Sequence, residues 1–322
     1  MRGPTLQGEQ MSKILTIVTS AYKAEKYLEG YFQNILSLEG LERFQVIVVL
    51  NDATPAEKKI ADTYQNRFPE TFRLVYTPRE TIGASTNRGY TMADSVYVVY
   101  ADVDDLRPPD AYVRQIQTLD NNPDVDFTYG DFLDVKKIGD TTGRRAVTAA
   151  FDRLSFTRGC LVGPNHFFRK RLLEKVGFWD EQLRSGGDFE FQVRAAFNCK
   201  FKKTEGVLVY KLDAAQSASQ GILQPLERTV IELRYGIYDK IDYNYLPDAV
   251  RYNIAYLWHN GTWQPIRSFI PGYDELLERR RKEWFSKGVS RYYWQLEKEK
   301  SVLRRLARSA KKIGKKILGK FK

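Results

Sequence analysis

The segment VYVVYADVDDLRPPD, residues 96–110, constrains the fold of this chain more than any other. Its apolar first part, rich in Val and Tyr, is typical of a buried strand. The strand ends in three carboxylates, Asp102, Asp104 and Asp105. Because ionised carboxylates are costly to bury and repel one another, this arrangement favours a bound cation. Carboxylate oxygens suit Mg²⁺ or Mn²⁺, which often also bind a substrate's phosphates. The alternative is a polar loop in which one aspartate caps a helix.

Segments typical of strands and of helices alternate in the N-terminal third of the chain. Apolar runs that indicate buried strands lie at 14–19, 45–50, 72–76 and 96–101, and helical spacing lies between them at 24–38, 55–68 and 82–92. This alternation predicts an α/β fold with a mainly parallel sheet and helices on both faces. Ligands of such sheets bind at the carboxyl ends of the strands. We therefore expect Ser20, Asp52 and the three aspartates to meet at one edge.

The later part of the chain is less regular. Strands are predicted at 127–132 and 208–212, a short helix at 170–177, and a longer helix that opens at Gly186-Gly187-Asp188. From about Pro225 the pattern becomes helical and rich in aromatic residues, and from Tyr273 it is helical and highly charged. No internal repeat is present in the sequence.

The composition is that of a globular protein, with 43% hydrophobic and 28% charged residues among 322. Its two cysteines are too few for a disulfide framework, so a reducing compartment is expected. No apolar run is long enough to predict a membrane span, and no secretory signal pattern opens the chain. We interpret residues 1–11 as an expression scar or a disordered leader.

The net charge of +11 is concentrated in the last 22 residues, 301–322, which carry nine basic residues and no acidic one. Residues 1–300 therefore carry a net charge of only +2, and a nucleic-acid partner is not expected. At 100° per residue the apolar side chains of this tail share one side and the basic ones the other. That pattern is typical of a helix lying on an anionic membrane surface. The alternative is a helix packed on the domain with a solvated basic face.

Six segments follow one another along the chain: SAYKAEKYL, VVLNDATP, IGASTNRGYTMA, YADVDDLRPPD, NHFFRKRLLEKVGFWDE and GGDFEFQVRAA. In this order they resemble the inverting family 2 glycosyltransferases of GT-A fold. The resemblance covers roughly residues 12–222. It implies a Rossmann-like GT-A domain at 12–225, followed by a helical C-terminal region at 226–300 and the basic amphipathic helix at 301–322.

The resemblance also implies a site for a nucleotide-sugar and for Mn²⁺ or Mg²⁺. Asp104 would bind the metal, and Asp102 would share the metal or lie near the ribose. Asn51 or Asp52 would hydrogen-bond the base, and Gly83 would let the backbone approach the nucleotide. The other donor-binding positions implied are Ser20, Ala21, Tyr22, Glu25, Asn87, Arg88 and Val103.

The family's catalytic base falls on Asp188, which would deprotonate the acceptor hydroxyl. The alternative for Asp188 is a helix N-cap after two glycines. The glutamate that usually precedes the base is Gly187 in this chain. A further set of positions is expected on the acceptor or diphosphate side: Asp105, His166, Gly187, Gln216, Ser217 and Ser219. For His166, packing among aromatic residues is the alternative.

Together these features predict a metal-dependent inverting transferase that uses a nucleotide-sugar, by resemblance a UDP-sugar. The acceptor would be a hydroxyl of a glycan or lipid-linked molecule, as in bacterial cell-surface polysaccharide synthesis. The tail then predicts a cytoplasmic protein, peripheral on the inner face of the membrane. A homo-oligomer is left open.

The sequence argues against three rival classes of protein. A sugar-nucleotide pyrophosphorylase needs a glycine-rich loop after the first strand, and a nicotinamide enzyme needs GxGxxG, and the sequence has neither. The third rival is an inactive GT-A fold that binds glycans or acts as a membrane scaffold. Asp104 and Asp188, both present, argue against it.

Overall fold

The computed structural model describes residues 13–213 and 223–286. The expected leader, the amphipathic tail at 301–322, and Gln216, Ser217 and Ser219 lie outside the described residues. Predictions made for them therefore stay predictions, as does the division of the chain into domains.

The first part of the fold alternates strands with helices, as the sequence predicted. In chain order its elements are β1 (Leu15–Ala21), α1 (Glu25–Leu36), β2 (Phe44–Asn51), α2 (Pro55–Arg67), β3 (Phe72–Thr77), α3 (Ile82–Met92), β4 (Tyr97–Tyr100) and α4 (Ala111–Asp120). The next elements are β5 (Val125–Val135), β6 (Arg144–Ala146), α5 (Arg153–Phe156), β7 (His166–Arg169), α6 (Leu172–Val176), α7 (Gly187–Asn198) and β8 (Lys200–Leu212). The chain continues with α8 (Leu223–Tyr235), α9 (Leu246–Ala249), β9 (Tyr256–His259) and β10 (Thr262–Pro265).

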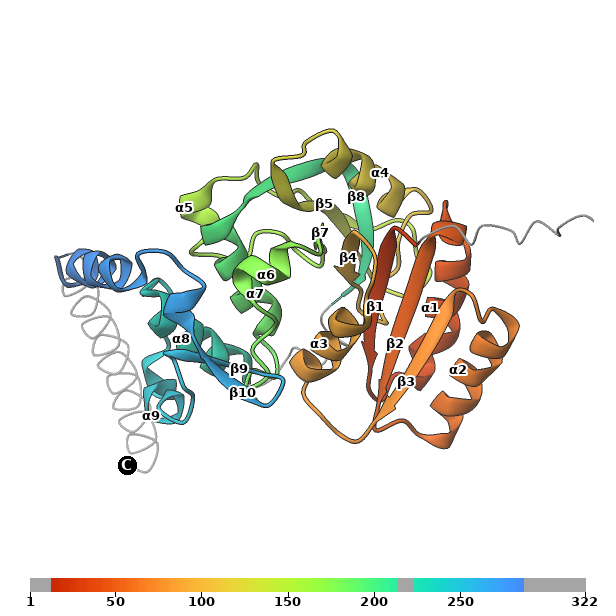
Figure 1. Ribbon diagram of the computed structural model, residues 1–322, viewed down its shortest axis with the longest axis horizontal. Coiled ribbons are helices and arrows are strands. Elements are labelled where there is room, and N and C mark those ends of the chain that lie inside the picture. The colour runs from red at the N-terminus through yellow and green to blue at the C-terminus, as the bar shows by residue number, and fades with distance from the viewer. Residues whose placement is uncertain (1–12, 214–222, 287–322) are drawn as a thin grey trace, which may run out of the picture.

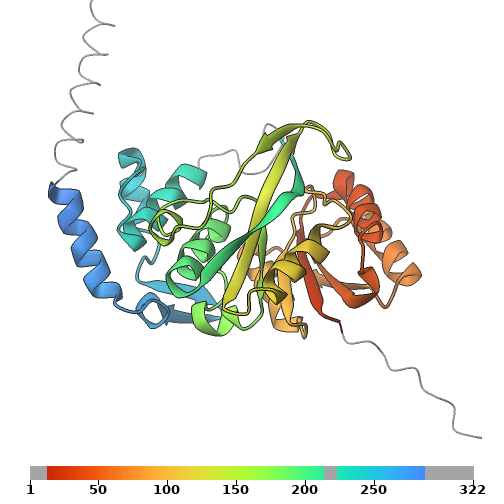
Figure 2. The ribbon, with the colours of Figure 1, turned by 90° about the horizontal axis from the view of Figure 1, so that it is seen from above.

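One mixed sheet forms the centre of the molecule. Its order is β3-β2-β1-β4-β7-β5-β6, and β8 pairs with β5. Strands β1 to β4 are mutually parallel, and β8 runs parallel to β5. The antiparallel β7, which the sequence pattern did not predict as a strand, lies between β4 and β5. Figure 2 shows the long β5 and β8 side by side.

The sheet is covered on both faces, which confirms the predicted fold class. Alternate side chains of β4 enter two different clusters: Tyr97 and Val99 pack with residues of α1, α2 and α4, whereas Val98 and Tyr100 pack with residues of α3, α6 and α7. This alternation follows from the two-residue period of a strand. Figure 1 shows α1 and α2 on one side of β1–β3 and α3 on the other.

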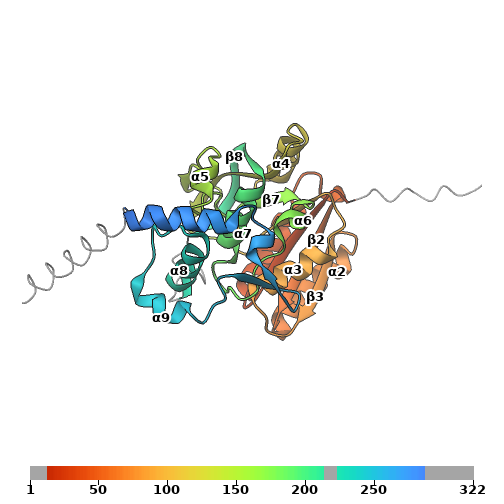
Figure 3. The same ribbon diagram turned by 60° about the vertical axis from the view of Figure 1, so that its left-hand side comes forward.

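The segment after Leu223 packs as a third cluster against α7. Buried residues of α8 join Leu183, Phe189 and Val193 in one apolar core. A helix at residues 273–286 lies alongside α8 (Figure 3). It is tied to the end of α8 by Tyr273 and Arg280, which donate to the backbone carbonyls of Arg234 and Tyr235.

The sequence pattern predicted that this segment is helical, but part of it forms strands. Strands β9 and β10 form an antiparallel hairpin in which Trp258 faces Trp263. The turn is Asn260-Gly261, and both residues have positive φ, 47° and 73°. A two-residue turn of this kind matches the twist of the flanking strands. The aromatic composition of the segment obscured that signal. No helix in the described part of the chain is both long and apolar enough to cross a bilayer.

Candidate active site

The loop after β4 is held in place by side chains of neighbouring elements. Thr19 of β1 donates to the carbonyl of Ala101, at 2.7 Å. The amide of Asn34 on α1 donates to the carbonyl of Arg107 and accepts from its N–H, both at 2.9 Å. Both ends of the loop that carries Asp102, Asp104 and Asp105 are therefore fixed by neighbouring elements at the carboxyl edge of the sheet.

The three aspartates form a repulsive cluster. Burial raises the pKa of Asp102 to about 6, and the charges of Asp104 and Asp188 add to the rise. The pKa of Asp104 is also raised, first by burial, although Lys211 and Lys26 oppose the rise. Arg107, which is 2% exposed, partly offsets the negative charge of all three. Sequence reasoning missed Arg107, although its place two residues after the last aspartate was a readable signal.

Asp105 differs from the other two because it is tied into the structure. It is buried, and its carboxylate accepts the N–H of Leu212 at 3.2 Å. The neighbouring Leu106 makes a β-bridge with Tyr210. Burial raises the pKa of Asp105 well above its ordinary value. The structure thus places Asp105 as a link between the acidic loop and the end of β8.

Asp102 and Asp104 remain as a pair suited to a divalent cation. Within the described ranges no group of three or more His, Cys, Asp or Glu side chains could hold a metal. Two partly exposed carboxylates at a strand end nevertheless fit a Mg²⁺ or Mn²⁺ ion that completes its shell with water and phosphate oxygens. The repulsion within this pair is what such a cation would relieve.

Asp188 lies in the first turn of α7 and is half-exposed. The N-cap is Gly186, and no side chain caps the helix, so the alternative that Asp188 is the N-cap was wrong. Its Oδ1 accepts the N–H of Phe189 at 2.7 Å. Because Asp188 raises the pKa of Asp102, the fold brings the carboxylate of α7 close to the acidic loop of β4. A negative side chain at this end of a helix is also favoured by the helix dipole.

His166 is the first residue of β7 and lies beside Asp188. It is 2% exposed, and its ring packs edge-on against Phe127 and Trp179. Burial lowers the pKa of His166, whereas the charge of Asp188 and a hydrogen bond to the Asp188 backbone raise it, and the net direction is down. The imidazole is therefore neutral at pH 7. Its Nε2 is buried without a hydrogen-bond partner among the described residues.

Gly187, the residue before Asp188, packs against the ring of Trp179. A Cβ placed there would lie 3.2 Å from Trp179 Cε3. A larger side chain at this position would therefore require the ring of Trp179 to shift by a few tenths of an ångström.

The expected nucleoside residues lie at the carboxyl ends of β1 and β2, as predicted. Ser20 is half-buried and Ala21 buried, and Glu25 is exposed at the start of α1. The ring of Tyr22 is covered by the Arg79 guanidinium, 3.3 Å from the ring centroid. Asp52 follows β2 with a positive φ of 54° and is exposed.

Asn51 and Asn87 are engaged within the protein. Asn51 is 1% exposed, donates to the carbonyl of Glu80 and accepts its N–H. Asn87 on α3 donates to the carbonyl of Trp179 at 2.9 Å and accepts its N–H. Both amides therefore brace loops, and Asp52 fits a base contact better than Asn51 does.

Gly83 and Arg88 on α3 also have partners in the protein. A Cβ on Gly83 would lie 3.2 Å from the carbonyl oxygen of Asp180, so this glycine admits the 179–181 segment. Arg88 pairs with Glu80 at 2.8 Å. Val103, 9% exposed, lies between the two metal-ligand candidates.

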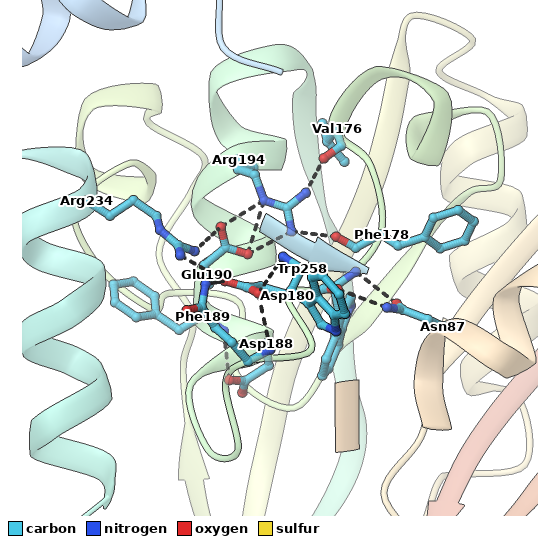
Figure 4. A network of polar contacts seen from close by, with 12 residues as sticks. Asn87, Val176, Phe178, Asp180, Asp188, Phe189, Glu190, Arg194, Arg234 and Trp258 are labelled. Carbon is cyan, nitrogen blue, oxygen red and sulfur yellow. Dashed lines mark hydrogen bonds and ion pairs between the residues drawn. The ribbon is translucent and has the colours of Figure 1, made fainter. Parts of the chain in front are cut away.

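A fully buried ionic network lies behind Asp188 (Figure 4). Arg234 of α8 binds Asp180 at 2.8 Å and Glu190 at 3.2 Å, and Arg194 binds Glu190 at 2.7 Å. Burial alone would raise the pKa of Glu190, but the two arginines hold it below its ordinary value. Arg194 also donates to the carbonyls of Val176 and Phe178. The network fixes α7 against residues 176–180, the segment that precedes the loop into α7.

Comparisons with known proteins agree on the family and the fold. The family model "Glycosyl transferase family 2" matches residues 16–177, half of the chain. An uncharacterised glycosyltransferase of Methanocaldococcus jannaschii, MJ1057, is 24% identical over 199 residues, which are 59% of this chain and 67% of that protein.

Solved structures of S. aureus TarS are similar in fold. The complex of TarS 1–349 with UDP-GlcNAc aligns with a TM-score of 0.56 and 16% identity, covering 69% of this chain and 64% of that one. The complex with UDP aligns with a TM-score of 0.54 and 14% identity, over 74% and 69%. This chain thus spans a little under two thirds of the first of these structures.

The fold is therefore of GT-A type, and the site is that of an enzyme that uses a nucleotide-sugar. The chain is a member of glycosyl transferase family 2.

Proposed function

We propose that this protein is a metal-dependent inverting glycosyltransferase that moves a hexosyl or N-acetylhexosaminyl group from a nucleotide-sugar to a hydroxyl acceptor. The observation that carries the proposal is the meeting of two acidic centres at the carboxyl edge of the sheet. Asp102 and Asp104 come from the loop after β4, and Asp188 comes from α7, close enough to act on Asp102. The Asp102 and Asp104 pair suits the binding of a cation and a diphosphate, and Asp188 suits the role of a general base.

Donor binding would use the loops after β1, β2 and β4. Tyr22, stacked by Arg79, and the exposed Asp52 would contact the nucleoside. Asp102 and Asp104 would hold Mn²⁺ or Mg²⁺. When bound, the cation would neutralise charge on the departing diphosphate. UDP is our choice of nucleotide, supported by the UDP and UDP-GlcNAc complexes of the similarly folded TarS.

Asp188 would remove the proton from the acceptor hydroxyl as its oxygen attacks the anomeric carbon, and the bond from that carbon to the diphosphate oxygen would break. The hydrogen bond from the Phe189 N–H orients the carboxylate. His166, neutral and donating one ring N–H to the Asp188 backbone, would accept a hydrogen bond at its unpartnered Nε2 from a hydroxyl of the acceptor.

The acceptor that we propose is a glycan or a lipid-linked molecule handled at the cytoplasmic face of a membrane. The support is the basic, amphipathic sequence of residues 301–322. The full chain should then co-sediment with vesicles containing phosphatidylglycerol and should be released by high salt. Equal binding to neutral phosphatidylcholine vesicles would contradict this part of the proposal.

A thermal-shift panel tests the donor site. UDP-, GDP-, dTDP- and CMP-sugars are each added with and without Mn²⁺, because a ligand of the native state raises its stability by mass action. We expect a Mn²⁺-dependent rise with UDP-sugars only. A rise with another nucleotide class would correct the donor, and no rise with any donor would favour an inactive fold.

A further inference from the structure

The loop that delivers Asp188 is anchored by one buried carboxylate from outside the matched family region. Glu227 lies on α8 and is fully buried. Its Oε1 accepts the N–H of Arg184 at 2.8 Å, and its Oε2 accepts those of Ser185 and Gly186 at 2.7 and 2.8 Å. Three successive backbone N–H groups thus converge on a single side chain.

This contact holds the chain that leads into α7, a helix with no N-cap side chain. The first N–H groups of a helix have no partner within it and are usually satisfied by a side chain at the N-cap. Here the N-cap is Gly186, which has no side chain to offer. Glu227 instead binds the N–H groups just before the helix, so the path of the chain into Asp188 depends on α8.

Packing supports the same dependence. A Cβ on Gly186 would lie 2.9 Å from Ile231 Cδ1 and 3.6 Å from Glu227 Oε2. The guanidinium of Arg228, also on α8, lies 4.2 Å from the ring centroid of Phe189, the residue after Asp188. Both Gly186 and Phe189, which flank the start of α7, are therefore in close contact with α8.

We propose that Glu227 is a positioning residue, which sets the place of Asp188 through the backbone of residues 184–186. The inference rests on the proposed function, in which Asp188 is the base. It adds that α8, which lies beyond the matched residues 16–177, is part of the catalytic apparatus.

The test compares Glu227→Gln with Asp126→Asn. Asp126 is the control: it is also a buried carboxylate, but it lies on β5, binds Arg171 and Lys175 and does not contact the 184–186 loop. Both variants lose a buried carboxylate, so a merely structural role would affect them alike. UDP release from a UDP-sugar in the presence of Mn²⁺ is measured across pH, together with the melting temperature.

We expect Glu227→Gln to lower kcat about tenfold or more relative to Asp126→Asn. The donor KM and the thermal shift given by UDP with Mn²⁺ should stay unchanged, and the acid limb of the kcat profile should move. Equal kcat values and superimposable profiles for the two variants would overturn the inference.

A second variant covers the case in which Glu227→Gln does not fold. Glu227→Asp keeps the charge but shortens the side chain by one methylene, which withdraws the carboxylate from the N–H groups of residues 184–186, so it should also lower kcat. Wild-type kcat in Glu227→Asp would contradict the inference. Asp188→Asn, measured in parallel, separates the two claims. If it retains wild-type kcat, the proposed base is wrong and the inference falls with it. If it is inactive while the Glu227 variants have wild-type kcat, only the inference is overturned.

Discussion

Asp102 and Asp188 interact electrostatically although they come from different elements, the loop after β4 and the first turn of α7. Burial is the main cause that raises the pKa of Asp102 to about 6, Asp104 adds to it, and Asp188 adds further. The free protein therefore holds mutually repelling carboxylates at the point where we propose that a cation binds.

Because the pKa of Asp102 is raised, its ionisation should lower the stability of the folded protein as the pH rises. Because the folded-state pKa lies above that of the unfolded chain, the stability contributed by Asp102 is present below about pH 4 and lost as the pH rises through about 6. Asp102→Asn should therefore stabilise the metal-free protein by about 1 kcal/mol at pH 7.5 and by little at pH 4. Urea unfolding at the two pH values measures this, and a variant that is destabilised at pH 7.5 would contradict it.

A bound cation should reverse this dependence. It favours the ionised carboxylates, so the affinity for Mn²⁺ with UDP should weaken as the pH falls through about 6. Calorimetric titration at pH 5.0 and 7.5 measures the change. Equal affinities at the two values would argue that Asp102 is not near the metal.

Asp104 and Asp105 should respond differently to the same substitution. Asp104→Asn removes a proposed metal ligand and should abolish the Mn²⁺-dependent thermal shift with UDP. Asp105→Asn replaces a buried carboxylate whose pKa is raised well above its ordinary value, and its amide oxygen can still accept the N–H of Leu212, so the variant should retain the shift and should not lose stability at pH 7.5. The opposite pattern would exchange the two roles.

The buried network predicts a large loss of stability when one partner is removed. Arg234→Met leaves Asp180 and Glu190 buried without a shared cation, and this should cost about 3–5 kcal/mol of unfolding free energy. Arg88→Met is the control: its partner is Glu80, its side chain is 45% exposed, and the loss should stay under about 1 kcal/mol. Similar losses for the two variants in urea would contradict this account.

Two helical glycines should respond to alanine with opposite signs. A Cβ on Gly89 of α3 would lie 2.3 Å from Val18 Cγ1 of β1, so Gly89→Ala should cost about 1–3 kcal/mol. A Cβ on Gly30 of α1 would lie 3.5 Å from Ile138 Cδ1, an ordinary contact, so Gly30→Ala should stabilise by about 0.5–1 kcal/mol. Thermal unfolding checks both signs.

The sequence predicted the strands whose side chains are nearly all apolar, because continuous burial leaves a clear pattern. The pattern predicted both ends of β2 to within one residue, but it predicted only the last part of β8. The first part of β8, KFKKTEG, is mostly charged or polar and lacks the apolar pattern of a buried strand. It pairs with β5, and no local signal showed that partner. The hairpin at Asn260-Gly261 was readable from its turn residues but was missed.

The acidic residues of the candidate site could be predicted, since their types and the strand ends were both visible. The partners of Asn51 and Asn87 could not, because an amide has the same appearance in the sequence whether it binds a ligand or a distant loop. Glu227 was equally hidden, since its partners are backbone N–H groups of residues 184–186.

The base assigned to Asp188 is the central claim, and Asp188→Asn tests it most directly. The variant keeps the size of the side chain and can still accept the Phe189 N–H. We expect kcat for Mn²⁺-dependent sugar transfer from a UDP-sugar to fall by about 10²–10⁴-fold while the Kd for UDP with Mn²⁺ stays unchanged. A kcat within a few fold of the wild-type value would contradict the account.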